Sequence, residues 1–479
     1  MVPDSSPRRT TLLRSSLLLA TLSGVVTFIM YLLPGQLISS EAIGIIGVGA
    51  LLIVLLYVAW ASTPGRLSDP RRASLRLALV IWWFLLISGP LFSRIGTAES
   101  AFEGRFSLAA YGEALIWVLT FLALLLISLV TPAYLRHMFS GPCKWLSLFA
   151  LVCLLSAAYS PRPLFSFAWA FKLALVALLL QFCRTHIHSL SDIRAFLRAT
   201  FWAFVFQTLL PLIRAFADPS TAFVGGRLNE VVASPAGFSE VAATLLVLSL
   251  TLYSLDGRKW LVVSSILASI VMILAGGKAA TIAGIISATL FFLFQKKTWS
   301  GLGILAGLSA LAAIIILVSP LSSYERDYWE SGQGSTLTGR TELWAVTWPV
   351  ILQNPILGHG YTASRFLSVQ VPGTFPEAGH VHNAFLEVLY NNGIVGLILI
   401  LLMHVEILKS CIGVIRDFPA RAAYLLAIGS LAMYVNLVIA GLFNASFGGR
   451  AYGSFMLFLA LPIIVERLRK THRTLPAPS

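Results

Sequence analysis

Two histidines and an asparagine stand close together in the segment Gly379-His380-Val381-His382-Asn383, just before a long apolar run. Imidazole titrates near neutral pH, so it can accept a proton from a hydroxyl group. Asn383 is a good helix-capping residue, which would place His382 at the positive end of the following helix. That end also favours a nearby phosphate. The segment predicts a general base beside an anion; the alternative is a pair of solvated loop histidines.

A metal site is another interpretation of the same histidines. His380 and His382 would join Glu387 as ligands, but no further ligands that would complete the set are convincingly spaced. The sequence contains no CxxC, HExxH or Walker motif and no GxGxxG after a strand, which argues against ATP and dinucleotide chemistry. The four cysteines are predicted to lie inside spans or near the inner face, without a disulfide. We predict no cofactor and no metal.

Basic residues recur in the polar segments that precede these histidines. They are Arg214, Arg227, Lys278, Arg340 and Arg365. A guanidinium group donates two parallel hydrogen bonds to a phosphate, and the glycine pairs at 225–226 and 276–277 would let backbone amides approach as well. The pattern predicts a site for an anionic, phosphate-bearing ligand. The alternatives are cations at the membrane interface and salt bridges to nearby carboxylates.

The elements that would position these residues are membrane helices. Hydrophobic residues make up 57% of the 479-residue chain and charged residues only 11%, and the mean hydropathy is +0.85. We predict an all-α, polytopic helical bundle with about 12–14 transmembrane helices, because each span needs roughly 20 apolar residues. The fourteen predicted spans are 15–35, 41–62, 77–93, 106–130, 145–159, 164–183, 199–216, 237–255, 260–276, 278–294, 301–320, 384–408, 422–443 and 453–466.

The basic residues orient this bundle. Most Lys and Arg side chains fall into the same set of loops when both termini are placed in the cytoplasm, as membrane topology favours. The net charge of +14 is then explained by topology and anionic lipid rather than by nucleic acid. The histidines and the five cations fall on the outer side, most of them in a large outer loop at 321–383. Within that loop, 342–352 has the apolar spacing of a short amphipathic helix ended by Asn354-Pro355.

Several motifs occur in a fixed order within about 220–410. They are Thr338-Gly-Arg-Thr-Glu-Leu-Trp344, Asn354-Pro-Ile-Leu-Gly-His-Gly-Tyr361, His382-Asn-Ala-Phe-Leu-Glu387 and Asn392-Gly-Ile-Val-Gly396. This order resembles the central domain of the O-antigen ligase and polysaccharide polymerase family. Gly226-Arg227 with Pro235, and the turn at Lys278, resemble two earlier family motifs. The family commonly has Ser-Arg in that turn, whereas Gly277-Lys278 keeps the charge but loses the planar fork.

The resemblance implies a metal-independent glycosyltransferase of the bacterial inner membrane with its active site facing the periplasm. Its donor would be a saccharide linked to undecaprenyl diphosphate. His382 would deprotonate the acceptor hydroxyl, and Arg227, Lys278 and Arg340 would bind the diphosphate. Accessory roles would fall to His380, Arg365, Arg214, Asn383 and Glu387. Trp344, Tyr361 and Tyr390 are candidates for stacking on sugars, with core packing as their alternative.

The acceptor stays open between two alternatives. A polymerase of exopolysaccharide or O-antigen would use another lipid-linked repeat unit, and a ligase would use lipid A-core. We favour the polymerase, because fourteen spans exceed the dozen or so typical of ligases. Further implied partners are the lipid bilayer, a flippase and a chain-length regulator.

A transporter or flippase of the same lipid-linked saccharides is the alternative from another class. Lys172 is the clearest charge deep in a span, but polar residues concentrate in the outer loops and no internal repeat is evident. The predicted organisation is N-terminal helices at 1–198, a ligase-like core at 199–410, and C-terminal helices with a basic tail at 411–479.

Overall fold

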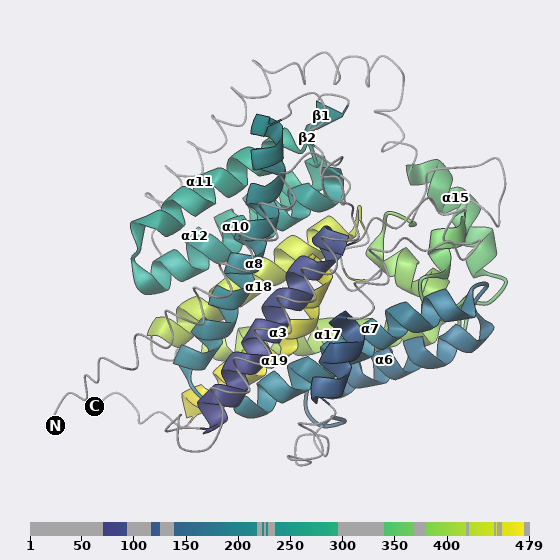
Figure 1. The fold of residues 1–479 in the computed structure, drawn as a ribbon, viewed down its shortest axis with the longest axis horizontal. Coiled ribbons are helices and arrows are strands. Elements are labelled where there is room, and N and C mark those ends of the chain that lie inside the picture. Colours follow the sequence, from purple (N-terminus) through teal and green to yellow (C-terminus); the bar gives the residue numbers. More distant parts are fainter. Residues whose placement is uncertain are drawn as a thin grey trace.

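A computed structural model gives the fold (Figure 1). It describes residues 70–92, 116–124, 138–217, 223–224, 227–228, 235–295, 340–367, 380–417, 421–444, 447 and 453–473. These residues form a helical bundle, and the all-α prediction is confirmed. Five helices are long and apolar enough to cross a membrane, and four shorter apolar helices accompany them among the described residues.

Most predicted spans coincide with helices. The helices are α3 (Pro70–Phe92), α6 (Cys143–Ser156), α7 (Pro163–His186), α8 (Leu190–Ala217), α10 (Pro235–Asp256), α11 (Lys259–Leu274), α12 (Lys278–Phe294), α15 (Arg340–Ile351), α17 (Ala384–Arg416), α18 (Arg421–Gly441) and α19 (Gly453–Arg473). Two short 3-10 helices are η2 (Ala157–Tyr159) and η3 (Ala363–Phe366). The predicted spans 15–35, 41–62 and 301–320 lie outside the described residues, and 106–130 is described only as helix at 116–124.

α8 begins well before the predicted span at 199–216. Its start is fixed by reciprocal capping: the Asp192 carboxylate accepts from the Ser189 amide at 3.0 Å, and the Ser189 hydroxyl accepts from the Asp192 amide at 3.2 Å. This first turn is polar, so a search for apolar residues alone misses it. The capped turn precedes the apolar run and belongs to the same helix.

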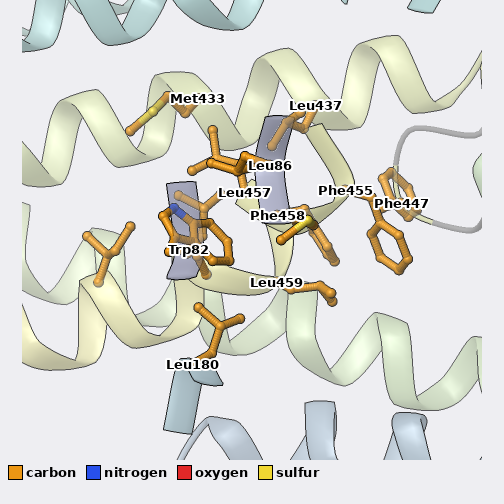
Figure 2. Packing of buried hydrophobic residues seen from close by; sticks show 14 of the residues in the cluster. Trp82, Leu86, Leu180, Met433, Leu437, Phe447, Phe455, Leu457, Phe458 and Leu459 are labelled. Carbon is orange, nitrogen blue, oxygen red and sulfur yellow. The ribbon is translucent and has the colours of Figure 1, made fainter. Parts of the chain in front are cut away.

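α19 is the central helix of the bundle. It contacts α3, α6, α7, α8, α10, α17 and α18, and nearly every side chain from Phe455 to Leu468 is buried. Figure 2 shows how side chains from three surrounding helices, among them Trp82, Leu180 and Met433, converge on this helix. A helix that is enclosed by other helices has no side facing water, which is consistent with the absence of a polar stripe on α19 in this region.

The helices end in two groups at opposite ends of the bundle. At one end, the Asn383 side chain donates to the Leu442 carbonyl at 3.0 Å, and the Asn444 side chain donates to Glu240 at 2.9 Å. At the other end, Arg184 of α7 forms a buried ion pair with Glu466 of α19 at 2.6 Å. We call the end that contains Asn383 and Leu442 the site end.

α17 is broken at Gly393, where φ is 61° and ψ is −163°. In a straight helix, Phe385 and His404 would lie about 28 Å apart, yet their ring centroids are 5.6 Å apart. The first segment of α17 (384–392) therefore folds back toward the second segment (394–416). At 1.5 Å per residue the second segment is about 34 Å long, which is enough to cross the hydrocarbon core by itself.

The loop at 355–360 fills the break in α17. The amides of His359 and Gly360 donate to the Tyr390 and Asn391 carbonyls at 2.9 and 2.8 Å, and the Ile394 amide donates to the Pro355 carbonyl at 2.8 Å. Backbone groups that a kink leaves without helical partners would be costly in a membrane protein. The loop at 355–360 satisfies them.

Candidate functional site

Asn383 caps the first segment of α17, as the sequence predicts. Its side-chain oxygen accepts hydrogen bonds from the amides of Phe385 and Leu386, both at 3.0 Å, and its side-chain nitrogen binds Leu442 after α18. The residue therefore fixes the start of the helix and joins it to a neighbouring helix. His382 stands immediately before this cap, next to the positive end of the helix dipole.

His382 has a left-handed backbone with φ of 56°. Few residues with a side chain adopt this conformation, and those that do often occupy functional sites. The His380 ring lies 3.9 Å from the His382 ring, centroid to centroid. The His382 amide donates to Nδ1 of His380 at 3.2 Å, which places the proton of a neutral His380 ring on Nε2. Nδ1 of His382 is buried and has no hydrogen-bond partner among the described residues.

Arg340 lies close enough to His382 to change its protonation. Burial of the ring and the positive charge of Arg340 together lower the pKa of His382 from 6.5 to about 4. Both effects disfavour the imidazolium form. His382 is therefore a neutral imidazole near pH 7, the state in which it can accept a proton.

α15 brings Arg340 to this place by packing against the first segment of α17. Leu343 and Ile351 of α15 form a buried cluster with Val381 and Tyr390. The Trp344 indole donates to the Val381 carbonyl at 2.9 Å, one residue before His382. The helix predicted at 342–352 is thus present as α15, and its buried residues Leu343 and Ile351 cover the start of α17, while Trp348 is exposed on the other side.

Glu387 is buried one turn inside α17, with 2% of its surface exposed. One carboxylate oxygen accepts from the Val381 amide at 2.8 Å, and the other accepts from the Ser364 hydroxyl of η3. Among the described residues, no group of three His, Cys, Asp or Glu side chains is arranged to hold a metal ion. The carboxylate of Glu387 instead binds the loop that carries His382.

Tyr361 and Tyr390 lie in the core. Both are fully buried; the Tyr361 amide donates to the Ser156 hydroxyl of α6 at 2.9 Å, and the Tyr390 ring packs on His359 with centroids 4.9 Å apart. These contacts match the core-packing alternative. Trp344 is half-buried and uses its indole nitrogen on Val381.

Lys278 lies at the site end, at the start of α12, which packs against α10 and α18. It is exposed at the first position of α12, directly after the turn that joins α11 to α12. The Ser239 hydroxyl of α10 donates to the Gly277 carbonyl in that turn at 3.4 Å. Because the next residue of α10, Glu240, binds Asn444 after α18, the turn belongs to the same end as Asn383.

Each of the remaining predicted cations lies in a different element. Arg227 is in β2 (Arg227–Leu228), which pairs antiparallel with β1 (Phe223–Val224) and contacts α11. Arg214 lies in the last turns of α8. Arg365 is half-buried in η3, beside Ser364. The structure thus joins His380, His382, Arg340 and Glu387 into one cluster and puts Lys278 at the same end of the bundle.

Residues 263–401 match the family model described as O-antigen ligase. The chain therefore carries an O-antigen ligase family domain. The match covers α12, α15 and the capped start of α17, so it contains the histidines, Arg340 and Lys278. A comparison with curated proteins gave no significant match.

The O-antigen ligase domain and the apolar helices together identify a multi-pass membrane protein. The matched domain supports O-antigen ligase or polymerase activity in general, an enzyme function that uses lipid-linked saccharides. Ser364 was missed by sequence reasoning, because no local pattern relates a serine at 364 to a glutamate at 387. The sequence offers one weak signal, the short polar residues Thr362 and Ser364 next to the aromatic residues Tyr361 and Phe366.

Proposed function

We propose that this protein is a polysaccharide polymerase of the exopolysaccharide or O-antigen type. It transfers a saccharide from undecaprenyl diphosphate to a sugar hydroxyl on the periplasmic face of the bacterial inner membrane. The observation that carries the proposal is the placement of His382. It is a neutral imidazole in a left-handed conformation, beside Arg340 and at a capped helix start. The family match at 263–401 supports this chemistry.

In the proposed reaction, the acceptor hydroxyl attacks the anomeric carbon of the donor. His382 takes the hydroxyl proton as the new glycosidic bond forms. The bond between the anomeric carbon and the phosphate oxygen breaks, and undecaprenyl diphosphate leaves with the electron pair. A neutral base within hydrogen-bond reach of the hydroxyl is what this step requires. The energy comes from the diphosphate linkage of the donor.

Arg340, Lys278 and Arg227 are proposed to bind the diphosphate. Negative charge on the leaving group grows as the bond breaks, and fixed cations stabilise it most at that moment. Arg340 also acts on the base, because its charge adds to burial of the ring in lowering the pKa of His382 in the free enzyme. A bound diphosphate would offset this positive charge and make His382 more basic when substrate is present.

Two alternatives are distinguished by their products. A ligase would transfer a finished chain once, to lipid A-core. A transporter would deliver the donor without joining sugars. The residue that favours this alternative is Lys172, a charged residue deep in a predicted span. Lys172 is fully buried in α7, and its ammonium group lies 4.4 Å from the centre of the Trp117 ring. A polar group that is enclosed by aromatic rings is equally well explained as a structural contact.

The test is an assay of the purified protein in detergent with undecaprenyl-diphosphate-linked repeat units, with and without lipid A-core. We expect a ladder of products from the repeat units alone for the wild type, and none for His382→Ala. His188→Ala is the matched control, since His188 is an exposed histidine between α7 and α8 at the opposite end. Single transfer to lipid A-core would establish a ligase instead. Full activity of His382→Ala would overturn the assignment of the base.

A further inference from the structure

The peptide units that precede His382 are held from two sides. Glu387 accepts a hydrogen bond from the Val381 amide at 2.8 Å, and Trp344 donates one to the Val381 carbonyl at 2.9 Å. Val381 itself is fully buried in the cluster between α15 and α17. The backbone atoms of Val381 therefore have fixed partners, one from within α17 and one from α15.

The other side of His382 is equally constrained. Asn383 caps α17 and binds the Leu442 carbonyl, so the helix start cannot shift without breaking both contacts. His382 is thus a left-handed residue between two anchored neighbours, with φ of 56°. Such a conformation costs on the order of 1–3 kcal/mol and persists only where the surroundings over-determine it. Val381 and Asn383 supply that constraint.

Glu387 is the residue that joins these constraints. Its carboxylate binds Val381 with one oxygen and Ser364 of η3 with the other, and Asn391 donates to the same carboxylate at 3.4 Å. Asn391 in turn accepts from the Ser364 amide at 2.9 Å. One buried side chain therefore ties the His382 loop, η3 and the first segment of α17 together.

We propose that Glu387 is a positioning residue for His382: it holds the base in its left-handed conformation through Val381, without touching the reacting atoms. The proposal rests on the function proposed above. A positioning role differs from that of a general acid or base and from that of a metal ligand. It fits Glu387 because both of its carboxylate oxygens accept hydrogen bonds from donors of the protein itself. A displacement of about 1 Å at a reacting group lowers rates by about 100-fold.

The test compares Glu387→Ala with Glu387→Gln. A glutamine can accept from the Val381 amide with its oxygen and donate to the Ser364 hydroxyl with its nitrogen, so it keeps both contacts without a charge. We expect kcat to fall about 100-fold in Glu387→Ala, with the KM for the lipid-linked donor near that of the wild type. Glu387→Gln should restore most of kcat. A carboxylate that takes part in the chemistry would not be replaced by glutamine.

A second measurement does not depend on activity. Hydrogen exchange of the Val381 amide, resolved by overlapping peptides, should be slow in the wild type and in Glu387→Gln, and fast in Glu387→Ala. Ser364→Ala removes one contact and keeps the bond to Val381, so it should leave this amide protected. It also provides a milder variant if Glu387→Ala does not fold, and it should then lower kcat less than His382→Ala.

The outcomes separate the two proposals. If the wild type joins no saccharides, the proposed function fails, while hydrogen exchange still tests the contact between Glu387 and Val381. If the wild type is active but kcat and Val381 exchange are unchanged in Glu387→Ala, the positioning role is wrong. Equal loss of kcat in Glu387→Ala and Glu387→Gln would also overturn it, because the charge would then be essential.

Discussion

In the proposed reaction, His382 acts as the base although its basicity is low. Its pKa of about 4 in the free protein comes from burial and from Arg340. The base must be neutral to act, so activity is lost as the pH falls through this pKa and is retained above it. We expect kcat/KM, which reports the free enzyme, to decline only near pH 4 on the acid side. The value of kcat reports the substrate complex, and there the decline should lie at higher pH, because a bound diphosphate, as proposed, would raise the pKa of His382.

Removing the charge of Arg340 should change both the pH profile and the affinity. Arg340→Gln abolishes a positive charge beside His382 but leaves the ring buried, and burial is the larger cause of its low pKa, so the acid limb of kcat/KM should move upward from near pH 4 by a small part of the distance to 6.5. The value of kcat/KM should also fall about 100-fold, as for loss of one donor to a developing anion. Arg340→Lys keeps the charge and should leave the limb in place. An unshifted limb in Arg340→Gln would show that Arg340 does not act on His382.

At the scale of the elements, the break in α17 depends on Gly393. Its φ and ψ of 61° and −163° lie in a region that is essentially limited to glycine, and a Cβ there would collide with the Ile356 carbonyl. Gly393→Ala should therefore destabilise the protein by ~3 kcal/mol and release the loop at 355–360. Gly413 lies in the same helix with open space around it, so Gly413→Ala should be neutral or slightly stabilising.

Melting temperature in detergent and hydrogen exchange at 390–396 measure this difference. Faster exchange confined to Gly393→Ala would support the docking of the loop into the break. Equal melting temperatures for the two glycine variants would contradict it. The site would be affected as well, since the first segment of α17 carries both Asn383 and Glu387.

Most helices and the cap of α17 could be predicted, because they are encoded locally; the capped first turn of α8 was missed, because it is polar. Apolar runs gave the spans, and Asn383 before such a run gave the cap of α17. The fold-back at Gly393 could not be predicted in this way. Asn391-Asn392-Gly393 is typical of a turn and was a sign that the helix is interrupted. The partners of the break are backbone atoms of 355–360, however, and no local pattern relates these two segments. The same holds for Glu387 and Ser364, whose contact depends on how η3 packs on α17. The roles of Arg227 and Arg214, and the division at 198 and 410, stay predictions.

At the scale of the whole molecule, the two ends of the bundle have different chemistry. The site end gathers amide caps, histidines and the start of α12, whereas the opposite end contains an ion-pair network between α7 and α19. There, the Arg184 guanidinium makes two contacts with the Glu466 carboxylate, at 2.6 and 2.9 Å. Because α19 contacts most other helices, this pair fixes the central helix against α7 far from the proposed chemistry.

Breaking this pair should therefore weaken the fold without changing the site. Glu466→Ala leaves the Arg184 guanidinium buried without its carboxylate, and loss of one partner of a buried pair typically costs ~3 kcal/mol or more. Lys470 also binds Glu466, but its side chain is 56% exposed against 9% for Glu466, so Lys470→Ala should cost less than about 1 kcal/mol. Melting in detergent should separate the two variants clearly. Below its lowered melting temperature, Glu466→Ala should keep the pH profile of the wild type, because His382 and Arg340 are untouched; a shifted profile would mean that the two ends are coupled.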